Sequence, residues 1–327
     1  MNILFISPTS YTGGGQRWLQ MLTGGLTERG HQCKIIFSER GHPGTIFHNI
    51  LHDMVLHHLC YRCFEYDWPA RVAAAIDEHE IDVLVVEHSE RIDEIIPLCK
   101  RPPRVVFVDH TMCRETVDQL RAVDAWVDEV VCVSHKIAAK IDWCPAKVIH
   151  NACPPVPKLG INVREFMGIP KDAFVVGYIG RVDRNKTVDH LVGAAINRGW
   201  WLLIVGRGPL MGHIASTQYP QLKVFPTDVY YVGDWYEAMD VFCLPSEEEG
   251  FPLTPLEALS CGCRVAMTPV SDFPELFGDS IAFFPHRSVE LVAAVENAPP
   301  PDEAQAIMHE QLGLDRMIEQ YLEVLEG

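Results

Sequence analysis

The sequence contains no apolar run that approaches the roughly 18 residues needed for a membrane-spanning helix. It is also poor in positive charge, because 27 Lys and Arg residues stand against 44 Asp and Glu residues, for a net charge of −17. This balance argues against binding to a phosphate backbone, so nucleic acid is disfavoured as a partner, and it argues against docking on anionic lipid. A local basic pocket remains compatible with it. No basic residue precedes the first apolar stretch, MNILFIS, which we interpret as a strand and not as a signal peptide.

The cysteines show no disulfide pattern. There are 11, an odd number, and several lie in apolar stretches, such as Cys132 and Cys243. This usage is typical of free thiols in a reducing compartment, so we expect a cytoplasmic protein.

One cluster of metal-ligand types stands apart, because a C-x-x-C pair follows two histidines: His57, His58, Cys60 and Cys63. A structural zinc site usually brings a second pair with similar spacing, and the nearest further cysteines lack it. We therefore expect a helix face with incidental ligands here and no metal site.

Short apolar runs alternate with helical patterns twice along the chain, which predicts an α/β fold with two doubly wound domains. The predicted strands of the first half are residues 3–7, 33–38, 83–87, 105–109 and 130–133, and those of the second half are 175–179, 201–205, 222–225, 241–244, 264–267 and 281–284. Helices are predicted over residues 16–29, 188–197 and 302–326. In the segment NACPPVP, residues 151–157, three prolines exclude a helix interior or a central strand, so this segment is the predicted linker.

The most informative motif is SEEEGFPLTPLEALSCG, residues 246–262, directly after a predicted strand. Seven residues separate Glu249 from Glu257 in it. The letters T-P-L-E predict a capping box with Thr254 as the N-cap, in which Glu257 reaches back to the Thr254 amide. Alternatively, Glu257 faces a ligand cleft and accepts hydrogen bonds from ribose hydroxyls. The amides of Leu253 and Thr254 at the start of this helix would attract an anion.

A second motif, GRVDRNK, residues 180–186, also follows a predicted strand. Arg181 offers a planar fork of donors and Lys186 a point charge, and together they can neutralise a diphosphate. The alternative is a solvated turn in which Asp183 pairs with Arg184. Ligands of doubly wound domains bind at the carboxyl ends of the strands, and this position favours the phosphate site.

Together these segments resemble a GT-B fold glycosyltransferase of family 4. The resemblance rests on Gly13–Gly15, Gly180–Lys186, the segment VGRGP at 205–209 and residues 240–262 with their two glutamates, and it extends from residue 1 to about residue 285. It implies two Rossmann-like domains facing a deep cleft. Residues 1–150 would be the acceptor-side domain, joined by a C-terminal helix at 308–327 that crosses back onto it. Residues 151–307 would bind the nucleotide sugar.

The resemblance also implies a retaining, metal-independent hexosyltransferase without a cofactor, which uses a UDP-, GDP- or other nucleotide sugar and an unidentified acceptor. Arg181 and Lys186 would hold the donor diphosphate, Glu249 the sugar hydroxyls and Glu257 the ribose, while His110 would line the reaction centre. The other implied donor-binding residues are Gly14, Gly15, Gly180, Phe225, Thr227, Gly250, Phe251, Leu253 and Thr254.

The sequence departs from the family pattern at three places. Gln16 stands where an acid is frequent, Thr187 stands where glycine is usual, and the stretch from Phe225 to Asp240 is short. The acceptor-binding site would be shaped by residues 39–67 and 112–118. We expect the leaving diphosphate to take the acceptor proton, so that the protein supplies positioning and electrostatics; a double displacement through a carboxylate is the alternative mechanism.

Three other functions compete with this interpretation. A nucleotide-sugar epimerase shares the fold, and a non-catalytic nucleotide-sugar-binding partner subunit would keep the same residues. A nicotinamide-dependent oxidoreductase is a more distant alternative, suggested by Gly13–Gly15 and by Glu39 at the end of the next strand. In that case Trp18 would occupy the third glycine position of the dinucleotide motif, where an indole blocks close packing of helix and strand.

Overall fold

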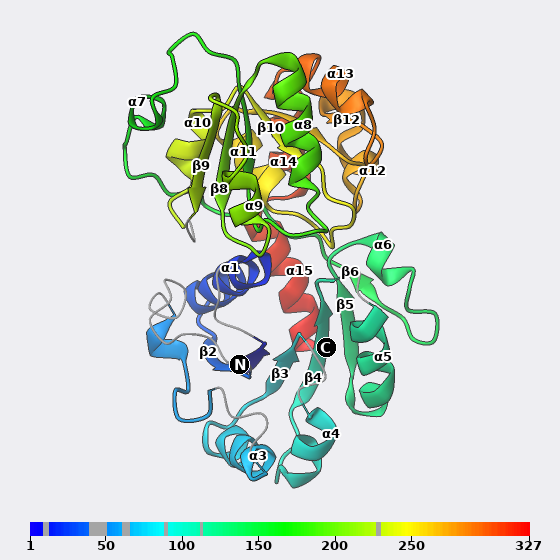
Figure 1. Cartoon of the computed structure of the whole chain (residues 1–327). Helices are drawn as coiled ribbons and strands as arrows, with labels where there is room; N and C mark the ends of the chain where they lie inside the picture. Colours follow the sequence, from blue (N-terminus) through cyan, green and yellow to red (C-terminus); the bar gives the residue numbers. More distant parts are fainter. Residues whose placement is uncertain (9–12, 39–50, 61–65, 88–90, 112–113, 227–229) are drawn as a thin grey trace. The chain divides into compact units, whose positions relative to one another are not determined.

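The computed structural model describes residues 1–8, 13–38, 51–60, 66–87, 91–111, 114–226 and 230–327 (Figure 1). The chain divides into two compact units. Unit 1 comprises Met1–Ala152 and Leu314–Gly327, and unit 2 comprises Cys153–Gly313. In its described residues each unit holds one six-stranded sheet, and all of the paired strands are parallel.

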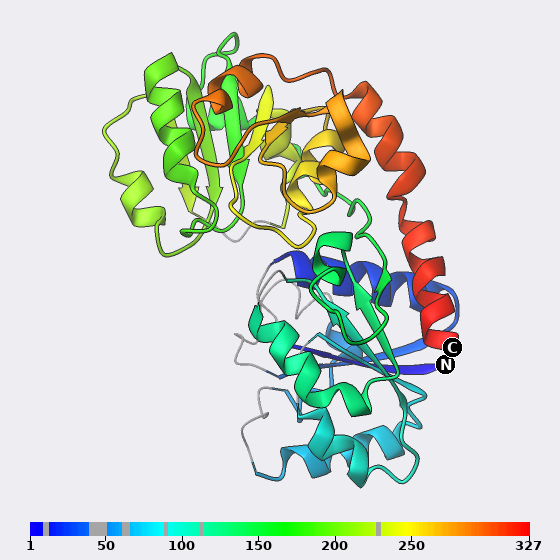
Figure 2. The same ribbon diagram turned by 90° about the vertical axis from the view of Figure 1, so that its right-hand side faces the viewer.

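The elements of unit 1 alternate as the apolar pattern predicts. They are β1 (Asn2–Ser7), α1 (Gly14–Glu28), β2 (Gln32–Phe37), η1 (His52–Met54), α3 (Trp68–Glu78), β3 (Val83–Val86), α4 (Ile92–Ile95), η2 (Ile96–Leu98), β4 (Arg104–Asp109), α5 (Arg114–Val123), η3 (Asp124–Trp126), β5 (Glu129–Cys132), α6 (His135–Ala138), β6 (Lys147–Val148) and α15 (Leu314–Glu326). The strand order is β2-β1-β3-β4-β5-β6. The sheet is nearly edge-on in Figure 2, with α1 on one face and α3 and α4 on the other, which explains why its strands are mostly apolar.

Helix α15 packs on α1 within unit 1, through contacts that glycine makes possible. A Cβ atom at Gly25 would lie 2.6 Å from the side chain of Ile318, so only a glycine admits this approach. The indole nitrogen of Trp18 donates a hydrogen bond to the hydroxyl of Tyr321 at 3.1 Å, and both side chains are fully buried. Arg29 pairs with Asp315 at 2.7 Å. Gly25, which has a lower helix propensity than alanine, therefore has a packing role in α1.

Unit 2 repeats the alternation. Its elements are α7 (Val163–Met167), β7 (Val175–Ile179), α8 (Val188–Arg198), β8 (Trp201–Gly206), α9 (Met211–Ala215), β9 (Leu222–Pro226), α10 (Gly233–Glu237), β10 (Val241–Leu244), α11 (Thr254–Ser260), β11 (Arg264–Met267), α12 (Phe273–Phe277), η4 (Gly278–Ser280), β12 (Ala282–Phe283), α13 (Glu290–Glu296) and α14 (Asp302–Gln311). The strand order is β12-β11-β10-β7-β8-β9. Strands β7 and β10 are therefore neighbours, and the loops that follow them lie side by side.

Glycines bring the loop after β8 against the loop after β7. A Cβ atom at Gly206 would lie 1.9 Å from the carbonyl oxygen of Gly180, and a Cβ atom at Gly208 would lie 2.3 Å from that of Val182. The Val182 amide donates to the Arg207 carbonyl at 2.8 Å, which extends the pairing of β7 with β8. This close backbone approach fixes residues 180–182, from which Arg181 projects.

The predicted single helix over residues 302–326 is wrong, because two helices occupy this stretch. Helix α14 ends at Gln311 and α15 begins at Leu314, as Figure 2 shows. The carbonyl of Leu312 accepts a hydrogen bond from the Cys153 amide at 3.1 Å, so it is not available to continue the helix. Met308 and Leu312 are buried within unit 2, and the segment that groups with unit 1 begins at Leu314 instead of residue 308. Within the described part of the chain, no helix combines the length and the apolar character needed to cross a bilayer.

Candidate active site

The loop after β7 carries two of the predicted cationic residues. Asp183 organises it, because its Oδ1 atom accepts the amides of Asn185 at 3.0 Å and Lys186 at 3.2 Å. The Oδ2 atom of Asp183 pairs with Nε of Arg181 at 2.6 Å. The alternative pairing of Asp183 with Arg184 is therefore wrong, because the carboxylate of Asp183 pairs with Arg181 instead. The Arg181 side chain is 73% exposed and so remains accessible to an anion.

Lys186 meets Glu249, which lies in the loop after β10. The Nζ atom of Lys186 is 2.5 Å from Oε1 of Glu249, and the two side chains are only 17% and 13% exposed. The hydroxyl of Ser246 donates to the same carboxylate oxygen at 2.6 Å. Two of the predicted site residues, 63 positions apart, are thus brought into direct contact. Partial burial strengthens this attraction relative to a surface pair.

Glu257 lies on α11 but does not cap it. The helix begins at Thr254, the N-cap position is Leu253, and no side chain caps it, so the predicted capping box is wrong. Glu257 is 4% exposed, and its Oε2 atom accepts a hydrogen bond from the Tyr236 hydroxyl at 2.8 Å. Tyr236 is fully buried on α10, so a long-range contact takes the carboxylate that the local pattern assigned to the Thr254 amide.

The segment before α11 is held from the neighbouring loop. The Ser271 hydroxyl donates to the carbonyl of Gly250, and the Phe251 ring is buried against Phe273 at 5.1 Å between centroids. Phe251 can therefore offer a donor substrate only its backbone. Among the described residues, the Thr254 amide has no hydrogen-bond acceptor, as expected for a helix start that could bind an anion.

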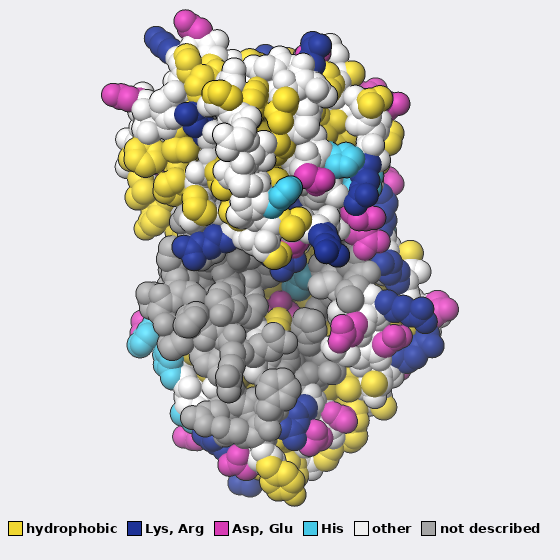
Figure 3. All heavy atoms as spheres, in the orientation of Figure 1, with side chains coloured by type: hydrophobic (Ala, Val, Ile, Leu, Met, Phe, Trp, Pro, Cys, Tyr) yellow, Lys and Arg dark blue, Asp and Glu magenta, His cyan; other side chains and the backbone are white. Residues whose placement is uncertain are grey.

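Phe225, one of the predicted donor-binding residues, lies on the edge strand β9. Its ring packs on Trp235 at 4.5 Å between centroids and on Phe166 at 6.0 Å. Phe166, on α7, is 63% exposed, and apolar side chains gather on the face of unit 2 that carries α7 and β9 (Figure 3). Thr227, another predicted donor-binding residue, lies outside the described residues.

In unit 1, the predicted glycine loop opens α1. Gly13 is the N-cap residue, and Gly14 and Gly15 form the first turn. A Cβ atom at Gly15 would lie 3.1 Å from Oε2 of Glu87, so the glycine lets a largely buried carboxylate approach the helix start. The Gly14 position is open, since no atom of the described residues would lie within 4 Å of a Cβ atom there. Contact of these amides with a sugar or phosphate stays a prediction.

His110 follows β4 and packs edge-on against Trp18, with 4.4 Å between the ring centroids. Asp109, at the end of β4, is fully buried. Its Oδ1 atom accepts the amide of Thr111 at 2.8 Å and the Thr111 hydroxyl at 3.2 Å. Burial raises the pKa of Asp109 to about 6, and the Thr111 hydrogen bonds oppose this only in part.

The histidine–cysteine cluster does not lie on a helix face as predicted, because residues 57–60 form turns after η1. The thiol of Cys60 is buried and donates to the Leu56 carbonyl at 3.4 Å, and burial raises its pKa to about 11. The His57 ring lies near the His52 ring, tilted by 48°, with the centroids 4.6 Å apart. Cys63 lies outside the described residues, so the cluster as a whole stays a prediction.

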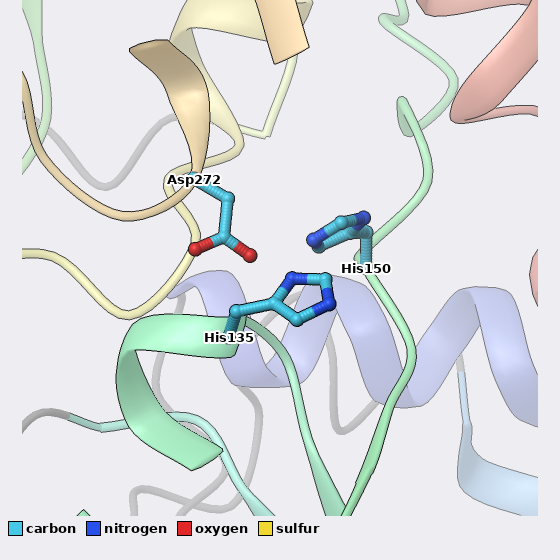
Figure 4. Close-up of side chains that lie close together, drawn as sticks. All are labelled: His135, His150 and Asp272. Carbon is cyan, nitrogen blue, oxygen red and sulfur yellow. The ribbon is translucent and has the colours of Figure 1, made fainter. Parts of the chain in front are cut away.

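A second histidine pair lies in unit 1. His135 begins α6 and His150 follows β6, with 5.6 Å between the ring centroids (Figure 4). Asp272, also labelled in Figure 4, belongs to unit 2, where it precedes α12. The pair supplies two nitrogen ligands from unit 1, fewer than the three protein ligands of a typical catalytic zinc site.

Comparison with known proteins decides the family. The model of Glycosyltransferase Family 4 matches residues 12–155, and the model of Glycosyl transferases group 1 matches residues 173–298. The chain belongs to glycosyltransferase family 4.

The mannosyltransferase LpsB of Rhizobium meliloti, from lipopolysaccharide core biosynthesis, is 29% identical over 216 residues, which are 58% of this chain and 61% of LpsB. A D-inositol 3-phosphate glycosyltransferase of Catenulispora acidiphila is 30% identical over 164 residues, 44% of this chain and 36% of the relative. The chain thus matches less than two thirds of the length of these relatives.

Solved structures show which fold the chain has. HepE of Anabaena, in complex with UDP-glucose, has a TM-score of 0.79 at 18% identity and covers 100% of this chain and 99% of its own. Sucrose-phosphate synthase of Thermosynechococcus elongatus has a TM-score of 0.79 at 15% identity, and the match covers 100% of this chain and 98% of the synthase chain. Both likenesses identify the fold of this family 4 chain as GT-B.

Sequence reasoning missed two polar partners in this family 4 site. Ser246 hydrogen-bonds Glu249, and Tyr236 hydrogen-bonds Glu257. Ser246 stands three residues before Glu249 in the loop that follows β10, so its position in the motif indicated that it could reach the carboxylate. Tyr236 offered none, because it lies on another helix and the chain places it by packing alone.

Proposed function

We propose that this chain is a retaining glycosyltransferase that moves a hexose-type sugar from a nucleotide diphosphate sugar to an acceptor hydroxyl. Family membership supports a glycosyltransferase, and the observation that carries the proposal is the paired Lys186 and Glu249 beside Arg181 in one unit. Two cations suit the negative diphosphate of the donor. A UDP-sugar is the favoured donor, since the structural relative HepE was solved with UDP-glucose.

Each residue has a separate task in this reaction. Arg181 and Lys186 hold the donor diphosphate and stabilise the charge that develops when the bond between sugar and phosphate breaks. Glu249 accepts hydrogen bonds from the donor sugar hydroxyls, and Glu257 accepts them from the ribose. The acceptor hydroxyl attacks the same face of the sugar that the diphosphate leaves, and the leaving phosphate oxygen takes the acceptor proton. The anomeric configuration is thereby retained.

The unit 1 residues act on the acceptor side. His110, at the end of β4, lines the reaction centre, and the amides of Gly14 and Gly15 contact sugar or phosphate. Residues 39–50, 61–65 and 112–113, which belong to the segments proposed to shape the acceptor site, lie outside the described residues.

The proposal is tested by nucleotide release. Purified protein is incubated with UDP-, GDP-, ADP- and dTDP-sugars, and the free nucleoside diphosphate is measured with and without a mixture of candidate sugar acceptors. One donor should be consumed, faster with acceptor, and the rate should survive chelation of divalent metals with EDTA, because Arg181 and Lys186 supply the charge. NMR of the product should show the donor's anomeric configuration.

Two results would contradict the proposal. A donor whose sugar changes configuration with no acceptor present would indicate an epimerase. Binding of a nucleotide sugar without turnover under any of these conditions would indicate a non-catalytic partner subunit.

A further inference from the structure

We propose that Asn185 and Thr187 are positioning residues for Lys186. They hold the loop after β7 against the loop after β10 and so form a latch between the two loops. This inference rests on the proposed function, because it assigns Lys186 to the donor diphosphate. The residues on either side of Lys186 both hydrogen-bond the loop that carries Glu249. Lys186 therefore stands between two fixed points, and its side chain reaches the carboxylate without further ordering.

Asn185 provides the first fixed point through three hydrogen bonds. Its backbone carbonyl accepts the amide of Glu247 at 2.7 Å. Its side chain then pairs with the backbone of Glu248 in both directions: Nδ2 donates to the carbonyl at 2.8 Å, and Oδ1 accepts the amide at 3.1 Å. The side-chain amide thus reproduces the pairing of two neighbouring strands beyond the point where β7 and β10 have ended.

Thr187 provides the second fixed point. Its hydroxyl donates to the carbonyl of Pro245, and the residue is 3% exposed. The backbone of Thr187 has φ 42° and ψ 39°, a left-handed conformation that a β-branched residue adopts only at a cost. Glycine would adopt this left-handed conformation freely, but it has no hydroxyl group to donate to the Pro245 carbonyl. The conformation is retained because the contact with Pro245 holds it.

The hydrogen bonds of Asn185 and Thr187 limit the motion of Lys186, whose side chain is flexible. A lysine side chain has four rotatable bonds, and ordering it on a ligand costs conformational entropy. In the structure this ordering is already present, since Nζ of Lys186 lies 2.5 Å from Oε1 of Glu249. Fixing the backbone on both sides keeps that geometry, and a diphosphate then meets an ammonium group already in place.

The test uses binding of UDP and UMP measured by calorimetry, a readout independent of turnover. Asn185→Ala and Thr187→Gly should each weaken UDP binding about 10-fold and UMP binding less, because Lys186 faces the diphosphate. In a Lys186→Ala background, the same two substitutions should have little further effect on UDP binding. This lack of additivity identifies residues that act through Lys186.

Matched variants separate positioning from folding. Thr187→Ser keeps the hydroxyl and should bind UDP within about twofold of the original chain. Thr187→Gly relieves the backbone and loses the hydrogen bond, two opposed effects, so its melting temperature should stay close to that of the original chain while UDP binding falls. Glu80, at φ 48° in unit 1, is the control position: Glu80→Gly relieves similar strain and should leave UDP binding unchanged.

The outcomes are distinguishable. Equal losses for UDP and UMP, or losses that add to that of Lys186→Ala, would show a general structural role and overturn the positioning role. UDP binding within twofold of the original in both Asn185→Ala and Thr187→Gly would overturn it as well. If the original chain binds UDP but turns over no donor, the proposed function fails while the latch is still measured by binding. A chain that binds no nucleoside diphosphate overturns both.

Discussion

The ammonium nitrogen of Lys186 lies 2.5 Å from a carboxylate oxygen of Glu249, although the residues are 63 positions apart in sequence. Neighbouring strands β7 and β10 bring their loops together, and the two side chains are mostly shielded from water. Each therefore depends on the other in the absence of substrate. In the proposed reaction the diphosphate meets the ammonium group where it already lies and the sugar hydroxyls meet the carboxylate beside it, so one pair serves both ends of the bond to be broken.

Lys186→Ala should reduce both turnover and stability. Loss of the cation should lower kcat/KM for the donor about 100-fold, because the leaving diphosphate loses charge stabilisation. The free energy of unfolding should fall by about 1 to 3 kcal/mol, because Glu249 stays largely buried without its countercharge. Nucleotide release and urea denaturation measure the two effects.

The matched control for this variant is Arg198→Ala. It breaks the more exposed pair of Arg198 with Glu296, away from the site, and should cost less than about 1 kcal/mol with unchanged turnover. If Lys186→Ala retained turnover within a few-fold of the original chain, the phosphate role of this lysine would be wrong.

Glu257→Gln should selectively weaken recognition of the ribose. A hydrogen bond from a ligand hydroxyl to a carboxylate is worth about 1.5 to 3 kcal/mol, so UDP binding should fall about 10-fold or more. Binding of 2′,3′-dideoxy-UDP, which lacks the ribose hydroxyls, should hardly change. Calorimetry with both nucleotides measures the difference. An equal loss for both nucleotides would mean that Glu257 serves only its internal contact with Tyr236.

The sequence predicts the strands well because most of them are continuous apolar runs, so that β7, β10 and β11 have the predicted bounds. It also predicts that the cationic motif and the paired glutamates follow strands. It fails where a partner comes from elsewhere in the chain. The local pattern around Glu257 gives no sign of Tyr236, and the apolar stripe of the C-terminal segment gives no sign that the Cys153 amide binds the Leu312 carbonyl. Such partners are chosen by packing, which the local pattern does not contain.

Gly24 and Gly25, adjacent in α1, should respond in opposite ways to alanine. No atom of the described residues lies within 4 Å of a Cβ atom at Gly24, so Gly24→Ala should stabilise by about 0.5 to 1 kcal/mol through helix propensity. A Cβ atom at Gly25 would lie 2.6 Å from Ile318 on α15, and the overpacking should cost about 1 to 3 kcal/mol. Chemical denaturation compares the two. Adding Ile318→Val should recover part of the Gly25→Ala loss, and a Gly25→Ala chain as stable as Gly24→Ala would contradict the packing of α15 on α1.

Asp109→Asn should change how stability depends on pH. Burial raises the pKa of Asp109 from its ordinary 3.8 to about 6 in the folded chain. Below pH 3.8 both folded and unfolded chains hold the proton, and the stabilising contribution of Asp109 is fully present. Between about pH 4 and 6 the unfolded chain releases the proton first, so this contribution is lost as the pH rises through 6. Asparagine carries no such proton, and its advantage over aspartate should therefore grow by about 3 kcal/mol between pH 3.5 and pH 7.5, two pKa units at 1.36 kcal/mol each.

Urea denaturation of both chains across this pH range measures the Asp109 effect directly. Asp67→Asn, at an exposed position before α3, is the matched control and should run parallel to the original chain at every pH. If the Asp109→Asn curve also ran parallel, the pKa of Asp109 in the folded chain would lie near its ordinary 3.8, and the carboxyl group would already be ionised at about pH 5. It would then need a cationic partner strong enough to outweigh its complete burial beside His110.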